Sequence, residues 1–419
     1  MKRREFFGKL AVKSAGLAVM GATAGCAGTR NSDAGLRVAP GASAKRGAVL
    51  NGIDVLVKQD FAPLRGLRLG LITNHTGHDR ERRATIDLLK NAGVQLTALF
   101  GPEHGIRGQF DEKIGDSVDQ QTGLPVHSLY GERRSPAPEQ LRGLDALAFD
   151  IQDIGCRFYT YPSTMGLCLE AAAKAKLKFF VFDRINPING VALEGPVPPD
   201  KFSFTAFYRV PLRHGMTVGE LAQMWNAEKA LGADLTIIRA EGWRREMWFD
   251  ETGLPWTNQS PNMRSLPAAT LYPGLGLHET PLSVGRGTDK PFEMIGAPYI
   301  DDVRVAAELD GAALPGVRCV PVRFTPTYST FKDKPCGGMA FVITDRNRLD
   351  AVDLGITIAL VLQRLYPNDF ALSKVNTLLQ HKLTMDVILA GRTLGEIKNA
   401  WNAELREFKQ RRQPFLLYG

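Results

Sequence analysis

Glu103 and His104 are the neighbouring residues in this chain whose types point most directly to chemistry. They follow an apolar run, residues 94–100, that ends at Gly101-Pro102. A carboxylate beside an imidazole can carry protons in general acid–base catalysis. Glycine and proline permit the tight turn that such a junction requires. We therefore interpret this turn as one rim of an active site, with an ordinary polar loop as the alternative.

Similar polar residues follow other apolar runs, at positions where a strand of a sheet would end. The residues at these positions are Asn74, His75, Glu103, His104, Asp150, Asp153, Asp183 and Arg184. In open α/β sheets, ligands bind beyond the carboxyl ends of parallel strands. One polar loop would mean little, but the repetition predicts a cleft along this edge.

The elements that must position these residues alternate along the chain. Apolar runs at 67–73, 94–100, 124–129, 145–151 and 177–182 predict strands, and segments 83–92 and 163–175 predict helices. Strands that are apolar throughout indicate a parallel sheet covered on both faces. The predicted fold class is therefore α/β, with a Rossmann-like domain at 47–204. Residues 205–419 are expected to form a smaller α/β or α+β domain that closes over the first, with the active site in the cleft between them.

The segment after the fourth strand carries further candidates. Asp150 and Asp153 are followed within twelve residues by Arg157, Tyr159 and Tyr161. A carboxylate there could act as base, the arginine could pair with a substrate carboxylate, and the tyrosines could stack on a sugar ring. Capping by Asp153 and aromatic packing between domains form the structural alternative.

Later polar positions are compatible with either ligand contacts or structural roles. Asp183 and Arg184 could form an ion pair, and His214 stands at the entry to a helix whose start is marked by Thr217 and Glu220. Glu194 follows in the same polar cluster as Asp183. Loop positions suited to a hydroxylated or anionic ligand are Asn262, Ser283 and Arg286.

Composition and motifs exclude several classes of function. The formal charge is +8, but the basic residues are scattered, which argues against nucleic-acid binding. The chain has no Gly-x-Gly-x-x-Gly turn after its first strand, no Walker motif and no Gly-x-Ser-x-Gly elbow. We expect no cofactor and, because the histidines and cysteines lack ligand spacing, no metal. The remaining inventory of carboxylates, arginines and aromatic residues suits glycoside hydrolysis.

The first residues predict export. Arg3-Arg4, an aromatic pair and a lysine precede an apolar Gly/Ala-rich segment from 10 to 24, which is typical of a twin-arginine signal. Cys26 is a candidate lipid acceptor, with ordinary cleavage after Ala24 as the alternative. Residues 27–46 are expected to be a flexible tether. We therefore expect a periplasmic or cell-envelope protein that contacts the membrane only through such an anchor. Cys156 and Cys168 are expected in the core.

With these residues in view, the chain resembles the exo-acting β-N-acetylmuramidase family of bacterial cell-wall glycosidases. The resemblance covers residues 50–419 in order. The motifs that carry it are Asn74-His-Thr-Gly, Gly101-Pro-Glu-His-Gly-Ile-Arg-Gly, Asp150-Ile-Gln-Asp-Ile-Gly-x-Arg-Phe-Tyr-Thr-Tyr, Asp183-Arg-x-Asn-Pro-Ile-x-Gly, Glu194-Gly-Pro, Arg213-His-Gly-Met-Thr-x-Gly-Glu, Ser260-Pro-Asn-Met and Ser283-Val-Gly-Arg-Gly-Thr.

The resemblance implies a Rossmann-like domain, a smaller C-terminal domain, and an active site between them that releases terminal N-acetylmuramic acid from the non-reducing end of peptidoglycan fragments. It also implies that Glu103 is the leading catalytic residue. One departure stands out, because His278-Glu279-Thr280-Pro281 replaces the Glu-Gly-Thr-Asn that the family tends to have. A glutamate therefore lies one position along.

These observations combine into one hypothesis. Glu103 is the expected general acid/base, helped by His104, and Asp150 or Asp153 supplies the second carboxylate. Arg157 or Arg286 would neutralise the lactyl carboxylate of muramic acid. The alternatives are a non-catalytic lipoprotein that binds muropeptides and a metal-dependent hydrolase.

Overall fold

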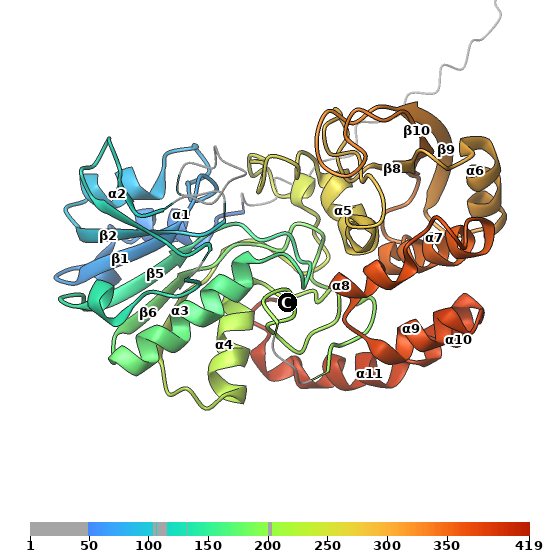
Figure 1. Ribbon diagram of the computed structural model, residues 1–419. Helices are drawn as coiled ribbons and strands as arrows, with labels where there is room; N and C mark the ends of the chain where they lie inside the picture. Colours follow the sequence, from blue (N-terminus) through green and yellow to red (C-terminus); the bar gives the residue numbers. More distant parts are fainter. Residues whose placement is uncertain (1–48, 104–105, 107–114, 132, 200–202) are drawn as a thin grey trace, which may run out of the picture. The chain divides into compact units, whose positions relative to one another are not determined.

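Seven strands form the larger sheet of the computed structural model, in the order β3-β4-β2-β1-β5-β6-β7 (Figure 1). The strands are β1 (Arg68–Thr73), β2 (Gln95–Gly101), β3 (Ser117–Val118), β4 (Pro125–Ser128), β5 (Ala146–Asp150), β6 (Lys178–Phe182) and β7 (Asp234–Ile238). Every neighbouring pair is parallel except β3 and β4, which are antiparallel. The structure describes residues 49–103, 106, 115–131, 133–199 and 203–419.

Helices cover both faces of this sheet. α1 (Gly52–Lys58) and α2 (Thr85–Asn91) lie on one side, and α3 (Tyr161–Ala175) and α4 (Val218–Glu228) lie on the other (Figure 1). Alternate residues of β6 show the reason. Phe180 and Phe182 pack in the core under α1 and α2, whereas Phe179 and Val181 pack in the core under α3 and α4. The predicted α/β class is confirmed, and the five strands expected up to residue 182 are each found within one residue of their predicted bounds.

The sheet also takes elements from beyond residue 205, where we expected the second domain. α4 begins after the predicted cap, and the Thr217 hydroxyl accepts a hydrogen bond from the backbone N–H of Glu220. β7 then pairs in parallel with β6 and completes the edge. Residues 47–419 form one compact unit.

The smaller C-terminal part is built on an antiparallel sheet in the order β8-β10-β9. Its strands are β8 (Met294–Ala297), β9 (Val317–Phe324) and β10 (Cys336–Ile343), and its helices are α5 (Leu266–Leu275), α6 (Asp302–Gly311), α7 (Ala351–Leu365), α8 (Asn376–Leu379), α9 (Lys382–Leu389), α10 (Leu394–Asn399) and α11 (Asn402–Arg411). Two expectations differ from the structure. Residues 243–298 showed little periodicity yet contain α5 and β8, and the helix expected at 394–411 is divided by the buried Trp401.

Close contact between α5 and α7 fixes the position of the chain that follows α5. A Cβ on Gly274 would lie 1.7 Å from the carbonyl oxygen of Ala351, and a Cβ on Gly355 would lie 2.6 Å from that of Gly274. Only glycine permits so close an approach of two backbones. The segment after α5, which carries His278 and Glu279, is therefore held firmly against α7.

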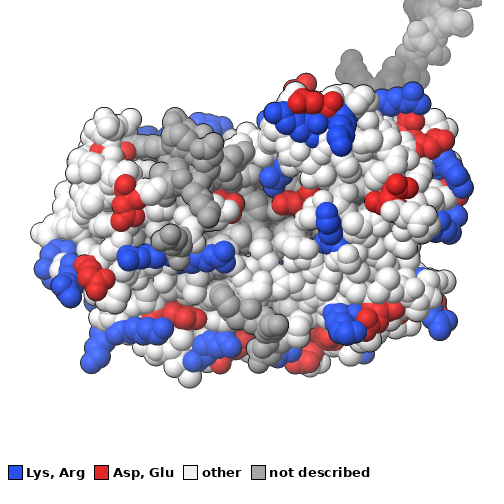
Figure 2. Space-filling view, in the orientation of Figure 1, with Lys and Arg blue, Asp and Glu red and all other residues white. Residues whose placement is uncertain are grey.

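Two further features bear on the environment of the protein. Within the described ranges, no helix has the length and apolar character needed to cross a bilayer. Cys156 and Cys168 are fully buried, as expected, and Cys319 and Cys336 are also buried free thiols. Acidic and basic side chains are interspersed over the face in Figure 2.

Candidate active site

A cavity of about 740 Å³ opens beside the carboxyl end of β2. Its walls come from both parts of the chain, and the lining residues are Glu103, Tyr130, Arg134, Phe158, Tyr159, Thr160, Tyr161, Ser203, Phe204, Thr205, Ser260, Asn262, Met263, Tyr272, Glu279, Arg286, Phe292, Tyr328 and Leu378. Two carboxylates, two guanidinium groups and several aromatic rings therefore share one space.

Glu103 is positioned by the end of β2 and by two hydroxyl groups. The Thr160 hydroxyl donates a hydrogen bond of 2.7 Å to its Oε2, and the Tyr130 hydroxyl also donates to this carboxylate. Burial and the neighbouring Glu103 charge raise the pKa of Tyr130 to about 12. Tyr130 therefore stays a protonated donor, and Glu103 accepts two hydrogen bonds inside the cavity.

Glu279 is the second carboxylate of the cavity. Burial raises its pKa, the charge of Glu103 raises it further, and the guanidinium of Arg286, 3.1 Å away, acts in the opposite direction. Its neighbour His278 turns away from the cavity and shares a 2.8 Å hydrogen bond with the carbonyl of Gly355 on α7. The one-position departure noted in the sequence thus leaves a glutamate in the cavity and a histidine in the core.

Aromatic rings form one wall of the cavity. Tyr159 packs edge-on against Tyr161 and against Tyr272, with ring centroids 5.0 and 5.9 Å apart, and Tyr272 packs edge-on against Phe292 at 4.7 Å. The Tyr161 hydroxyl donates to the carbonyl of Gln259 at 2.5 Å. Such a wall offers apolar faces to a sugar ring while its hydroxyls remain polar.

Asn262 adds an amide to the lining of the cavity. Its Oδ1 accepts a 2.5 Å hydrogen bond from the Tyr328 hydroxyl, which orients the amide. Among the site residues predicted from the sequence, those that line the cavity are Glu103, Tyr159, Tyr161, Asn262 and Arg286.

Asp150 and Asp153, the expected second carboxylate, do not line the cavity. Asp150 is fully buried at the end of β5, where Arg184 lies 2.6 Å away and the Thr85 hydroxyl donates a second bond. Asp153 is also buried and accepts a bond from the backbone N–H of Gly155. Burial raises the pKa of Asp153 to about 7. Both carboxyl groups are therefore bonded to protein groups in the interior, at the carboxyl ends of the strands.

His214 lies beside Asp153, with 3.8 Å between its Nε2 and the carboxylate Oδ2. Burial lowers the pKa of His214 to about 3, and the charges of Arg412 and Arg157 act in the same direction. The imidazole is therefore neutral, and its Nδ1 accepts a bond from the backbone N–H of Met216. His214 supports the entry to α4 and does not reach the cavity.

Arg157 is also structural in this arrangement. Its guanidinium donates to the carbonyls of Pro196, Leu378 and Leu379 at 3.0, 2.8 and 2.7 Å. It thereby joins the larger sheet to the C-terminal part rather than facing a ligand. Glu194 has a similar position, because it is buried against Arg213 and accepts a bond from the N–H of Ala351 at the start of α7.

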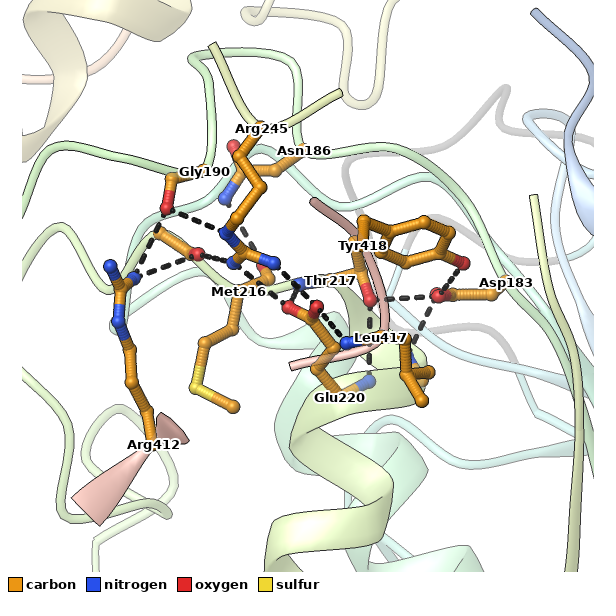
Figure 3. A network of polar contacts seen from close by, with 12 residues as sticks. Asp183, Asn186, Gly190, Met216, Thr217, Glu220, Arg245, Arg412, Leu417 and Tyr418 are labelled. Atoms are coloured by element: carbon orange, nitrogen blue, oxygen red, sulfur yellow. Dashed lines mark hydrogen bonds and ion pairs between the residues drawn. The ribbon is translucent and has the colours of Figure 1, made fainter. Parts of the chain in front are cut away.

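Asp183 lies in a buried polar network shown in Figure 3. Its carboxylate accepts bonds from the hydroxyls of Thr217 and Tyr418 at 2.7 and 2.6 Å and from the N–H of Gly219 at 2.8 Å. Glu220 and Arg245 form an ion pair of 2.6 Å in the same network. These contacts hold the last residues of the chain against α4.

The remaining predicted positions lie elsewhere. Asn74 is buried and accepts two bonds from Thr76, His75 contacts the carbonyl of Asn258 at 2.6 Å, and Ser283 is buried beside β8. His104 and Cys26 fall outside the described residues.

Sequence reasoning missed several lining residues. Tyr130 directly follows the run at 124–129, so the strand-end pattern could have found it, and Thr160 lies between two tyrosines that were singled out. Tyr272 and Tyr328 have no comparable local signal, because only tertiary packing brings them to the cavity. Across the described ranges, no cluster of three or more His, Cys, Asp or Glu residues could hold a metal ion.

A largely parallel α/β sheet and a cavity that holds two carboxylates beside aromatic rings are features of a glycoside hydrolase. Comparison with known proteins gives the family. Models of the N-terminal and C-terminal domains of exo-β-N-acetylmuramidase NamZ match residues 69–267 and 270–418. The chain belongs to this family, as the resemblance predicted.

Individual relatives agree with the family models. The chain is 41% identical over 384 residues to the peptidoglycan β-N-acetylmuramidase NamZ of Bacillus subtilis (strain 168), which covers 90% of this chain and 93% of the relative. Two crystal structures of DUF1343 family proteins from Bacteroides fragilis NCTC 9343 are also similar. The first has a TM-score of 0.84 and 36% sequence identity, and the match covers 89% of this chain and 99% of that protein. The second has a TM-score of 0.72 and 29% sequence identity, and the match covers 88% of this chain and 99% of that protein. The cavity draws on both matched regions.

Proposed function

We propose that this protein is an exo-acting glycoside hydrolase that releases terminal N-acetylmuramic acid from the non-reducing end of peptidoglycan fragments. The observation that carries the proposal is the presence of Glu103 and Glu279 in one aromatic-walled cavity. Glycosidases use two carboxyl groups on opposite sides of the bond that breaks. Family membership supplies the class of sugar, and the cavity supplies the groups that would act on it.

The surroundings of the two carboxyl groups favour different roles. Burial and the nearby Glu103 charge raise the pKa of Glu279, so Glu279 is the group suited to hold a proton and pass it to the leaving oxygen. Glu103 accepts bonds from Thr160 and Tyr130, which suits a carboxylate that acts as base or nucleophile. A glycosidase needs one carboxyl group that holds a proton and one that acts as base or nucleophile.

In this assignment Glu103 remains the leading catalytic residue, and the role of the second carboxyl group passes to Glu279. Glu279 takes the place that we had expected Asp150 or Asp153 to fill, because both aspartates are enclosed by protein. Tyr159, Tyr161 and Asn262 are proposed to contact the sugar. His104, which is outside the described residues, remains a predicted helper of Glu103.

Leaving-group dependence tests the two roles separately. A 4-nitrophenyl β-N-acetylmuramide needs little protonation as its bond breaks, whereas a muramyl disaccharide with a sugar leaving group needs an acid. Glu103→Gln should lower kcat/KM on both substrates by roughly 10³-fold. Glu279→Gln should lower it by roughly 10²-fold on the disaccharide and by less than about tenfold on the nitrophenyl substrate.

Several outcomes would overturn the proposal. Full activity of Glu103→Gln on both substrates would remove its catalytic role, and an equal loss for both substrates in Glu279→Gln would remove the acid role. Saturable binding of muropeptides by the wild type without any hydrolysis would instead favour the non-catalytic binding protein. Activity that a chelator abolishes would favour the metal-dependent alternative.

We also propose that the protein works in the cell envelope, where its substrate is found. The expected twin-arginine signal, the tether and Cys26 all lie among residues 1–46, outside the described residues. Radiolabelled palmitate incorporation, compared between the wild type and Cys26→Ala, tests the lipid anchor. Incorporation that persists in Cys26→Ala would exclude this cysteine as the acceptor.

A further inference from the structure

Arg134 lines the cavity and has no carboxylate partner among the residues that the structure describes. Its guanidinium carbon lies 4.0 Å above the centre of the Phe204 ring, and both residues line the cavity. Across the described ranges, no carboxylate lies within ion-pair distance of Arg134. The side chain is exposed, so its charge is accessible to a ligand and is oriented by the aromatic ring beneath it.

Arg286 and Arg157, the other arginines that could bind an anionic group of a ligand, are already bonded to protein groups. Arg286 lies 3.1 Å from Glu279, and its charge thus compensates a carboxylate that belongs to the cavity itself. Arg157 is buried and donates to three backbone carbonyls. Pairing either of them with a ligand anion would require an existing contact to break.

Arg134 is also close to the groups proposed to react. The positive charges of Arg134 and Arg286 both act on the pKa of Tyr130, in the direction opposite to burial and to Glu103. Tyr130 in turn donates to Glu103. Arg134, Tyr130 and Glu103 all line the cavity, so an anionic substituent on a sugar beside Glu103 would share this space with the guanidinium of Arg134.

We propose that Arg134 binds the lactyl carboxylate of N-acetylmuramic acid and so lets the protein distinguish this sugar from N-acetylglucosamine. The inference rests on the proposed function for the identity of the sugar. N-acetylmuramic acid differs from N-acetylglucosamine by one lactyl ether on O3, and that ether brings the only charge. A planar guanidinium binds a carboxylate with two parallel hydrogen bonds, and stacking on Phe204 holds it ready for that geometry.

Binding of monosaccharides tests this without any turnover. The probes are N-acetylmuramic acid, its lactyl methyl ester, which has the same shape without the charge, and N-acetylglucosamine. Isothermal titration calorimetry would compare the wild type with Arg134→Met, which keeps an apolar chain over Phe204, and with Arg134→Lys, which keeps the charge. Arg133→Met is the matched control, because Arg133 is exposed next to Arg134 but does not line the cavity.

The wild type should bind the free acid about tenfold more tightly than the methyl ester, as expected for a charge-assisted pair at an accessible site. Arg134→Met should abolish this preference and leave the affinities for the ester and for N-acetylglucosamine unchanged. Arg134→Lys should recover part of it, and Arg133→Met should match the wild type.

Retention of the preference in Arg134→Met would overturn the proposal, as would its loss in Arg133→Met, which would indicate a general effect of charge. A preference that disappears in Arg286→Met but not in Arg134→Met would assign the carboxylate to Arg286 instead. Failure of the proposed function would appear differently, as an absence of hydrolysis with the binding preference intact.

Discussion

Two groups of ionisable residues in this protein differ in whether protein groups satisfy their charges. In the strand-end group, Asp150 pairs with Arg184. In the network of Figure 3, Asp183 accepts bonds from Thr217 and Tyr418, and Glu220 pairs with Arg245. Each of these charges has its partners inside the protein. In the cavity group, Glu103, Glu279 and Arg134 face an open space of about 740 Å³.

The comparison shows that residue type and strand-end position do not by themselves identify a catalytic group. Buried charges are tolerated only when protein groups satisfy them, so a satisfied network contributes to the architecture. A charged group that remains accessible beside a cavity has capacity left for a ligand. The experiments below use this difference, which predicts loss of stability in one group and loss of activity in the other.

Glu220→Gln should cause the largest loss of stability. The substitution leaves Arg245 buried without its counter-charge, and breaking a buried pair costs about 3–5 kcal/mol. Urea unfolding would measure the change, and hydrolysis per folded molecule should stay within about twofold of the wild type. Glu279→Gln is the matched control in the cavity group, and a comparable loss of stability there would remove the distinction.

His214→Gln should change how stability depends on pH. The folded-state pKa of His214 is lowered to about 3 from 6.5, so its contribution is fully present above pH 6.5 and is lost as the pH falls towards 3. At pH 4.5 the wild type should have lost about 2–3 kcal/mol through this residue. The variant should lack that loss.

Asp153→Asn tests a pH dependence of stability that runs in the opposite direction to that of His214. The pKa of Asp153 is raised to about 7 from 3.8, so its contribution is present below pH 3.8 and is lost as the pH rises through 7. Relative to the wild type, this variant should gain stability between pH 4 and 7. Parallel pH curves for the wild type and both variants would contradict these assignments.

Gly274→Ala should lower both stability and activity, because Gly274 lies where α7 supports the segment that carries Glu279. The added Cβ meets the carbonyl of Ala351 at 1.7 Å, and such overpacking typically costs about 1–3 kcal/mol. Displacement of Glu279 should lower activity on the disaccharide as well. Gly395→Ala is the control, since a Cβ there meets nothing within 4 Å, and an equal effect in both variants would exclude the packing explanation.

The smallest expected effect is a change in the shape of the pH profile of Glu279→Gln, in addition to its loss of activity on the disaccharide. Because its pKa is raised, the proton on Glu279 should be lost as the pH increases, and disaccharide hydrolysis by the wild type should decline on the alkaline side. The residual hydrolysis of the same disaccharide by Glu279→Gln should lack that decline. An alkaline limb that persists unchanged in Glu279→Gln would assign it to another group.

The sequence was most informative about the sheet. Runs such as 67–73 and 177–182 are apolar on both faces, and this pattern is specific to strands covered on two sides. It was least informative between 243 and 298, where α5 carries Pro273 and Gly274, which contacts Gly355 of α7. Helix periodicity is weak there because the helix is buried nearly all round.

For the site, local motifs led to Glu103, Tyr159, Tyr161, Asn262 and Arg286, all of which line the cavity. They did not separate these residues from Asp150, Asp153 or Arg157, because burial of a strand-end carboxylate depends on partners distant in sequence. Arg184 is 34 residues from Asp150, and Leu378 is 221 residues from Arg157. Glu279 was recognised only as a departure from a motif, and its place in the same cavity as Glu103 depends on the contact between α5 and α7.

The central claim is that catalysis depends on the cavity carboxylates and not on those of the strand-end group. The most direct test measures the release of N-acetylmuramic acid from a muramyl disaccharide by Glu103→Gln and Asp150→Asn, each normalised to the folded fraction. We predict a loss of roughly 10³-fold in Glu103→Gln and less than about tenfold in Asp150→Asn. An active Glu103→Gln beside an inactive, folded Asp150→Asn would contradict the claim.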